Sequence, residues 1–215
     1  MKEIEYIAPI DIEKRSFEII TEELKAQGIT LDKRYDYIIK RCIHTTADFD
    51  YVKSLRFSEG AVDILKNLIR KGAYVVTDTN MAFSGINKTA LLKYGGEIKC
   101  YMSDPDLCKI AIDGGVTRAS LSMRKASHLE KEVIFVVGNA PTALITLREL
   151  YDSGYKPAFI IGVPVGFVNV EVSKELIMET DIPYIINYGR KGGSNVAAAI
   201  VNAVVYDMKK DDAGN

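Results

Sequence analysis

The feature that most constrains the fold is an alternation of short, apolar, β-rich runs with segments of helical periodicity. This alternation predicts parallel strands joined by crossover helices, and the nearly continuous hydrophobicity of the strands predicts a sheet covered on both faces. We therefore expect a three-layer α/β/α sandwich with a mostly parallel sheet. The predicted strands cover residues 73–77, 133–137, 158–163 and 184–187, with a weaker one at 97–101. The predicted helices cover residues 16–27, 33–45, 58–71, 141–153, 173–180 and 194–209.

Length and composition predict a single domain over residues 1–215, because a chain of 215 residues with 47% hydrophobic content can bury a large core. The mainly helical portion through residue 53 is expected to pack on the sheet or cover its ligand edge. The polar tail, residues 209–215, is expected to fray.

Charge and cysteine content restrict the partners and the compartment. The 28 basic and 29 acidic residues are mixed along the chain and leave a formal net charge of −1, which argues against nucleic acid as a partner. No apolar run reaches the roughly 18 residues of a membrane span, so a soluble protein is expected. Three cysteines without a CxxC pair fit the reducing cytoplasm.

Three loops follow predicted strands, where ligands of open parallel sheets bind. The first contains Gly138 and Asn139 before Pro141, and the second covers residues 164–169. The third covers residues 189–195 and combines two cations, Arg190 and Lys191, with the glycines Gly189, Gly192 and Gly193. Each loop taken alone fits an ordinary strand-to-helix turn, but together they suit a ligand with several negative groups, such as a polycarboxylate. None matches GxGxxG or GxxxxGK[ST], so no nucleotide is specified.

The two histidines differ in their surroundings. His44 ends a helical run where the sequence turns polar, so its ring can face a cleft and exchange protons; a structural histidine is an equally good interpretation. His128 lies in a charged stretch and is expected to face solvent. Neither has a partner at metal-ligand spacing, so no metal site is predicted.

Four further polar residues are candidates with simpler alternatives. Ser16, after Arg15, fits a helix N-cap. Arg118 follows a glycine-rich turn and can reach a carboxylate, although it also fits a surface arginine. Asp78 ends a strand on the ligand side and is suited to orient a loop, a helix N-terminus or the substrate.

The order and spacing of six segments resemble the precorrin-8 methylmutase family over nearly the whole chain. GNAPTAL and PVGFV are the most specific parts of the resemblance. The segments are EKRSFEII (13–20), RCIH (41–44), VTDTNM (76–81), GNAPTAL (138–144), GVPVGFVNVEVSK (162–174) and GRKGGSN (189–195).

The resemblance implies a flavodoxin-like fold, a homodimer with active sites near the subunit interface, and an isomerase of cobalamin (vitamin B12) biosynthesis. The implied reaction moves a methyl group from C-11 to C-12 of precorrin-8 or cobalt-precorrin-8, giving hydrogenobyrinate or cobyrinate, without a cofactor. By position in the motifs, His44 is the expected acid/base residue. Arg15, Ser16, Asp78 and Arg118 are expected at the substrate. Two alternatives remain: a tetrapyrrole methyltransferase with an external methyl donor, and a non-catalytic corrinoid-binding protein.

Overall fold

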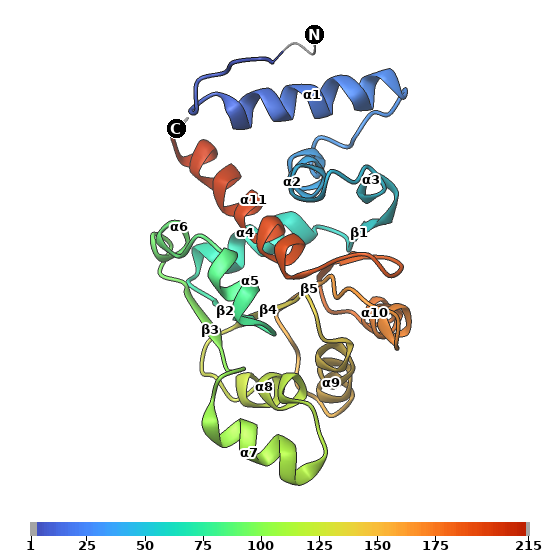
Figure 1. The fold of residues 1–215 in the computed structure, drawn as a ribbon. Helices are drawn as coiled ribbons and strands as arrows, with labels where there is room; N and C mark the ends of the chain where they lie inside the picture. The colour runs from blue at the N-terminus through green and yellow to red at the C-terminus, as the bar shows by residue number, and fades with distance from the viewer. Residues whose placement is uncertain (1–3, 214–215) are drawn as a thin grey trace.

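A computed structural model describes residues 4–213 and contains one mixed sheet of six strands in the order β1-β6-β5-β4-β2-β3 (Figure 1). The strands β2 to β6 are parallel, and β1 is antiparallel to its neighbour β6. Numbered from β2, the parallel strands follow the order 2-1-3-4-5 of flavodoxin-like sheets. The strands are β1 (Leu55–Phe57), β2 (Tyr74–Thr77), β3 (Glu97–Cys100), β4 (Val133–Val137), β5 (Phe159–Gly162) and β6 (Tyr184–Asn187).

Helices connect the strands and cover both faces of the sheet. Those before β2 are α1 (Ile12–Ala26), α2 (Asp36–Thr46), α3 (Tyr51–Ser54) and α4 (Ala61–Arg70). Between β2 and β4 lie α5 (Asn80–Gly85), α6 (Lys88–Leu92), α7 (Pro105–Gly114) and α8 (Arg118–Ala126). The remaining helices are α9 (Pro141–Asp152), α10 (Val170–Met178) and α11 (Ser194–Ala213).

The side chains of β4 alternate between two cores, as expected for a strand with both faces covered. Ile134 and Val136 pack in the core formed with α2, α4 and α11. Phe135 packs on the opposite face, in the core formed with α8, α9 and α10. The two cores on either side of one sheet confirm the three-layer α/β/α sandwich, which Figure 1 shows with α11 above the sheet and α8 and α9 below it.

The sequence prediction missed strand β1 and the helices α3, α5, α6, α7 and α8. Helices α3, α5 and α6 have four to six residues, too few to show a helical period. Strand β1 has only three residues, too few to show a period, and it is defined by its pairing with β6. Helices α7 and α8 lie in residues 105–126, for which no helix was predicted. Only Ala111 of α7 is buried, and α8 buries mainly small residues, so neither helix shows a strong apolar stripe.

Helix α11 continues to Ala213, into the tail from residue 209 for which fraying was predicted. Polar contacts hold the end of the helix on the body. The ammonium of Lys66 pairs with Asp207 at 2.7 Å and Asp211 at 2.9 Å, and the Tyr94 hydroxyl donates to Asp212. Residues 214–215 lie outside the described part of the chain.

Helix α1 is the outermost element and rests on α2, which in turn packs on α11 (Figure 1). It buries only Ile20 and Leu24, so the first predicted helix covers another helix and not the sheet. This part of the chain carries exposed apolar side chains, namely Ile4, Tyr6, Ile10, Ile12 and Ile19.

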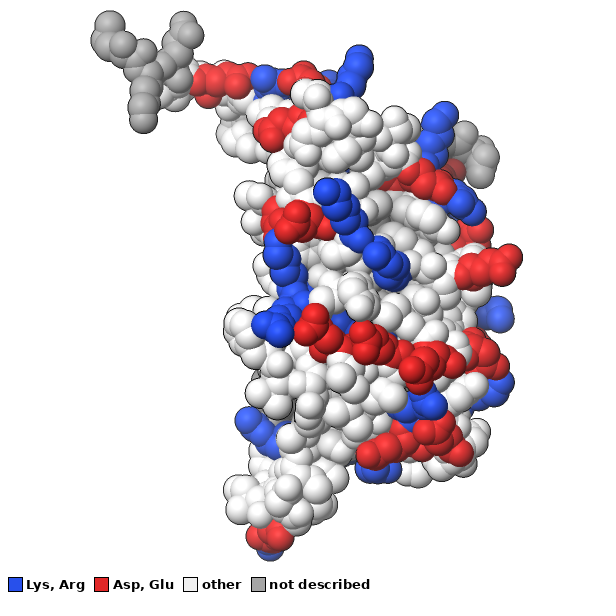
Figure 2. Space-filling view, turned by 90° about the vertical axis from the view of Figure 1, so that its right-hand side faces the viewer, with Lys and Arg blue, Asp and Glu red and all other residues white. Residues whose placement is uncertain are grey.

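The surface carries charges of both signs. On the face in Figure 2, lysines and arginines lie among aspartates and glutamates without a broad basic area. No helix within residues 4–213 has the length and apolar character needed to cross a membrane.

Candidate active site at the carboxyl edge of the sheet

Asp78 occupies the point where the strand order reverses, between the carboxyl ends of β2 and β4. Its carboxylate accepts three backbone hydrogen bonds, from the N–H of Gly138 (2.8 Å), Asn139 (2.8 Å) and Ala140 (2.7 Å). The side chain is fully buried, and burial raises the pKa of Asp78 against the opposing effect of these N–H groups. The carboxylate of Asp78 thus occupies the anion-binding position that the free N–H groups at the start of α9 would offer a ligand.

This arrangement changes the expected role of the Gly138 and Asn139 loop. Helix α9 begins at Pro141 as predicted, with Ala140 as the N-cap. However, the N–H groups expected to face a substrate carboxylate donate to Asp78 instead. Gly138 also allows close packing on α11, because a Cβ there would lie 2.7 Å from the Cα of Ser194. Asp78 therefore orients the loop, which was one of the roles considered for it.

The loops after β5 and β6 pack tightly on each other. The N–H of Gly193 donates to Val163 O at 2.9 Å, and the N–H of Gly166 donates to Arg190 O at 3.2 Å. Gly192 has a φ of +155° and lies so close to Val163 that a Cβ would overlap its carbonyl oxygen. Glycine is therefore needed at this position for a packing reason.

Lys174, on α10, holds the glycine-rich loop after β6 through hydrogen bonds to its backbone. Its side chain is buried, and its ammonium donates to Gly189 O at 2.6 Å and Lys191 O at 3.1 Å. Burial lowers the pKa of Lys174 to about 8. The backbone of the glycine-rich loop is thus held by a buried cation from α10.

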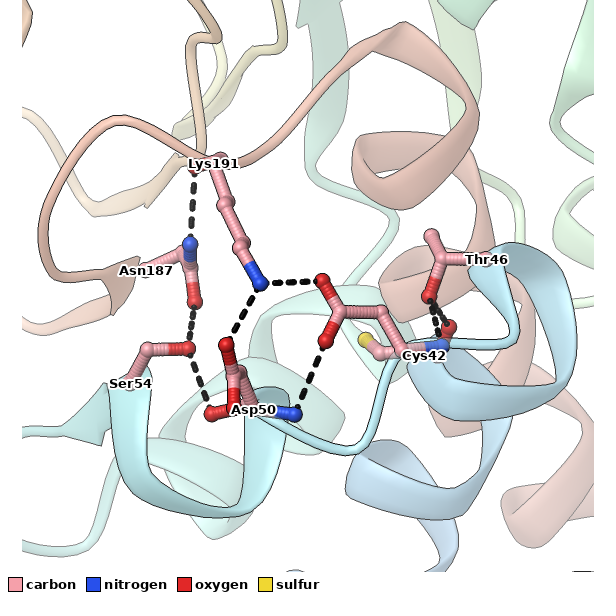
Figure 3. A network of polar contacts seen from close by, with 7 residues as sticks. Cys42, Thr46, Asp50, Ser54, Asn187 and Lys191 are labelled. Atoms are coloured by element: carbon pink, nitrogen blue, oxygen red, sulfur yellow. Dashed lines mark hydrogen bonds and ion pairs between the residues drawn. The ribbon is translucent and has the colours of Figure 1, made fainter.

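Lys191 extends from this loop toward the segment that follows α2 (Figure 3). Its ammonium forms ion pairs of 2.6 Å with both Asp48 and Asp50. The pair with Lys191 is the main cause of a lowered pKa at Asp48. Nearby, Ser54 donates to Asn187 Oδ1 at 2.6 Å, which joins α3 to the end of β6.

His44 lies on the exposed side of the last turn of α2. Its ring stacks on Phe17 of α1, with ring centroids 5.3 Å apart, and the Arg41 guanidinium lies 4.7 Å from the centre of the same Phe17 ring. A cavity of about 840 Å³ lies beside this stack, between α1, α2 and α11, and is lined in part by Phe17 and Arg41. The exposed imidazole is free to meet a ligand. His128 is exposed, as predicted.

The two predicted site residues on α1, Arg15 and Ser16, contact other residues of α1 and the segment that precedes it. Arg15 pairs with Glu5 at 3.0 Å and lies 3.7 Å from Glu18 and from Glu22. Ser16 is not an N-cap, because α1 begins one turn earlier, at Ile12, and the Ser16 hydroxyl donates to Ile12 O at 2.9 Å. The N-cap is Asp11.

Arg118 begins α8, at the other end of the same sheet edge. Its guanidinium donates to Met102 O at 3.1 Å and lies beside a cavity of about 460 Å³. The preceding Thr117 shares a hydrogen bond of 2.8 Å with Thr142 in the first turn of α9. The start of α8 is thus joined to the loop that Asp78 holds.

Hydrogen bonds and ion pairs join neighbouring loops along the whole carboxyl edge. Thr142 joins the start of α8 to the Gly138 loop, and Asp78 joins that loop to the end of β2. The 2.8 Å contact of Thr79 with Ser194 then joins α5 to α11, and Lys191 joins the glycine-rich loop to the segment after α2. Exposed apolar side chains lie along this edge, namely Met81 in the first turn of α5 and Val165, Phe167, Val168 and Tyr188 in the loops after β5 and β6. The edge therefore carries apolar side chains together with the cations Arg118, Arg190 and Lys191.

The sequence prediction missed Asp48, Asp50 and Lys174, and it included Lys191 only as one of the two cations of the glycine-rich loop. Lys174 had a usable signal, because a lysine on the buried face of a predicted helix requires a partner. Within residues 4–213, no three His, Cys, Asp or Glu side chains cluster as a metal site.

The fold and this edge define a flavodoxin-like α/β protein of the kind that binds ligands beyond the carboxyl ends of its strands, without a nucleotide fingerprint. The family model described as precorrin-8X methylmutase matches residues 11–207. The chain therefore belongs to the precorrin-8X methylmutase family, a family of isomerases.

Individual relatives agree with this assignment. The chain is 44% identical to a cobalt-precorrin-8 methylmutase of Salmonella typhimurium, over 94% of this chain and 97% of that protein. It is 45% identical to a cobalt-precorrin-8 methylmutase of Priestia megaterium, over 92% of this chain and 88% of that protein. The solved precorrin-8x methyl mutase of Thermus thermophilus superposes with a TM-score of 0.84 at 34% identity, covering 94% of this chain and 98% of that chain.

Proposed function

We propose that this protein catalyses the intramolecular migration of a methyl group from C-11 to C-12 of precorrin-8 or cobalt-precorrin-8, in cobalamin biosynthesis. Family membership supports the reaction, and the carboxyl edge supports the substrate class. The observation that carries the proposal is the series of linked loops along the carboxyl edge, which runs from the start of α8, beside Arg118, to Asp48, in the loop after the helix that carries His44. A macrocycle with several acetate and propionate groups requires contacts spread over such a width.

His44 is the proposed acid. Its imidazole is exposed and stacks on Phe17, which fixes the ring plane while leaving the ring nitrogens without a protein partner among the described residues. Protonating or hydrogen-bonding the ring C nitrogen of the substrate draws electrons from the framework and favours the methyl shift. The C-11 carbon–methyl bond breaks as the C-12 carbon–methyl bond forms, so no methyl donor is consumed.

The loops have distinct proposed tasks in binding. Phe167 and Val168 are 83% and 79% exposed and offer apolar contact to a flat ring. Arg190 lies above Phe167, with its guanidinium carbon 5.7 Å from the ring centre, and adds a cation for a carboxylate. The Gly138 loop, which Asp78 holds, packs against Ser194 at the end of the glycine-rich loop and gives that loop a fixed support.

We further propose that the protein acts as a homodimer whose partner subunit helps to enclose the substrate. Tyr6 and Ile10 are 90% and 89% exposed on the segment just before α1, a helix whose main contacts with the body are those with α2. Exposed apolar side chains gathered on one outlying part of a chain are typical of a subunit contact. Sedimentation equilibrium checks this: the wild-type protein is expected as a dimer and the variant with Tyr6→Asp and Ile10→Asp as a monomer.

We also propose a cytoplasmic location, since the three cysteines are free thiols and a reducing compartment keeps them so. Cell fractionation with an antibody to the protein checks this assignment.

The catalytic proposal is tested with dialysed, chelator-treated protein and precorrin-8 in its metal-free and cobalt-containing forms. The two curated relatives above carry the cobalt name and the Thermus structure the metal-free one, so both forms are needed. We expect a changed absorption spectrum and a product of unchanged mass with at least one form. A requirement for S-adenosylmethionine with a product heavier by one methyl group would support the methyltransferase alternative. Tight binding without turnover would support the carrier.

A further inference from the structure

Asp48 and Asp50 lie in the loop directly after the helix that carries His44, and Lys191 reaches them from the opposite side of the edge (Figure 3). We infer that the Lys191 bridge, meaning the two ion pairs of Lys191 with Asp48 and Asp50, positions the last turn of α2 and with it the His44 side chain. The inference rests on the proposed function and assigns to it three positioning residues. None of the three is proposed to touch the substrate.

The backbone of Lys191 is held in place by two hydrogen bonds. The Lys191 carbonyl oxygen accepts from the Asn187 side chain at 2.7 Å and from the buried Lys174 ammonium at 3.1 Å. Asn187 is itself held by Ser54. The lysine side chain therefore extends from a rigid anchor.

The chain on the His44 side turns sharply and under strain. The C-cap residue of helix α2 is Ala47, which adopts the left-handed conformation with φ of +54°, unfavourable for a residue with a Cβ. Thr46 then joins the helix to the loop, because its hydroxyl donates to Cys42 O at 2.8 Å and accepts from the N–H of Asp48 at 3.3 Å. The bridge attaches beyond this turn, four residues after His44, and so holds the last turn of α2 in place.

The charges favour positioning over substrate binding by Lys191. Its single ammonium is shared by two carboxylates, so the group of three carries an excess of negative charge and attracts a substrate carboxylate poorly. Asp48 is the less exposed of the two, with 29% of its side chain accessible against 69% for Asp50. Asp48 is therefore expected to carry more of the effect.

The test compares Lys191→Met with the double variant Asp48→Asn/Asp50→Asn in the full-length protein. Displacement of a catalytic group by about 1 Å can reduce turnover about 100-fold, so we expect kcat to fall about 10- to 100-fold with KM nearly unchanged in both variants. Combining all three substitutions should cost no more than either variant alone, and Lys191→Arg should recover much of the activity. The exposed pair Lys156 and Asp181, at the opposite edge of the sheet, provides the matched control, and Lys156→Met should leave kcat unchanged.

Each outcome decides between roles. If Lys191→Met raises KM while the double aspartate variant behaves as wild type, Lys191 binds the substrate directly and the inference is wrong. A wild-type rate in both variants also overturns it, whereas absence of turnover in the wild-type protein refutes the proposed function instead. A readout independent of turnover is the NMR signal of the His44 imidazole in substrate-free protein. We expect it to broaden or shift in Lys191→Met and to stay unchanged in Lys156→Met, while unchanged signals in both would contradict the inference.

Discussion

Replacing Asp78 with asparagine tests whether the hydrogen bonds between its carboxylate and the Gly138 loop stabilise the fold. The carboxylate accepts the Gly138 N–H with one oxygen and the N–H groups of Asn139 and Ala140 with the other. An asparagine keeps one acceptor oxygen, which best serves the latter two, and turns its own N–H₂ toward the buried Gly138 N–H. One buried donor is left unpaired, at a cost of about 1–3 kcal/mol, and the charge at the start of α9 is lost, at about 0.3–2 kcal/mol.

Desolvation of the Asp78 carboxylate opposes this loss and determines the net change in the free energy of unfolding. Burial raises the pKa of Asp78, so the neutral asparagine recovers part of the desolvation cost of the carboxylate. We therefore expect a net loss of about 2 kcal/mol in the free energy of unfolding for Asp78→Asn. Asp78→Ala, which leaves all three donors without a protein partner, should lose about 3–4 kcal/mol.

Urea unfolding followed by circular dichroism measures these differences. The control is Asp104→Asn, because Asp104 accepts the N–H groups of Asp106 and Leu107 at the start of α7, where asparagine caps equally well, and the substitution otherwise removes only the ion pair with the exposed Lys125 side chain. Its effect should be much smaller. An Asp78→Asn protein as stable as wild type, or an alanine variant no worse than the asparagine variant, would refute the structural role.

The remaining predictions concern three side chains of the same edge. His44→Ala should lower turnover about 100- to 10,000-fold while tetrapyrrole binding and the unfolding curve are retained, and His128→Ala should not; single-turnover absorption assays check both. Lys174 has a folded-state pKa of about 8, below its ordinary value of 10.5, so the unfolded chain binds more protons between these values. The free energy of unfolding should therefore contain a contribution that rises with pH above 8, and comparing urea curves of wild type and Lys174→Met at pH 7.5 and 9.5 should show its loss in the variant. Asp48 has a lowered pKa, so its stabilising contribution is present above its ordinary pKa and is lost as pH falls through the lowered value; carboxyl NMR titration should show this pKa rising in Lys191→Met.

The layers of the fold were predictable because their signals are local. The β4 run VIFVV is buried on both faces and could be recognised from five consecutive apolar residues. Pro141 marked the start of α9 because its missing N–H suits the first helical turn. Strand β1 gave no comparable signal, since its three residues become a strand only through pairing with β6, more than 120 residues away.

The sequence predicted where the loops of the candidate site lie, but not which side chains contact one another there. The sequence indicated which loops meet at the carboxyl edge, because parallel strands align their ends there. It gave no means to foresee that Asp78 occupies the N–H groups of the Gly138 loop, since that contact joins residues 60 positions apart. The ion pairs of Lys191 with Asp48 and Asp50 depend in the same way on how α2 packs over the sheet, which no local pattern encodes.

Migration of the methyl group within one substrate molecule is tested most directly by a crossover experiment. Substrate labelled with ¹³C in both the C-11 methyl group and the ring is mixed with an equal amount of unlabelled substrate and converted by the wild-type protein. Intramolecular migration gives products that are either fully labelled or unlabelled, with the ¹³C methyl signal now at C-12. Products that combine a labelled methyl group with an unlabelled ring would show transfer between molecules and contradict it.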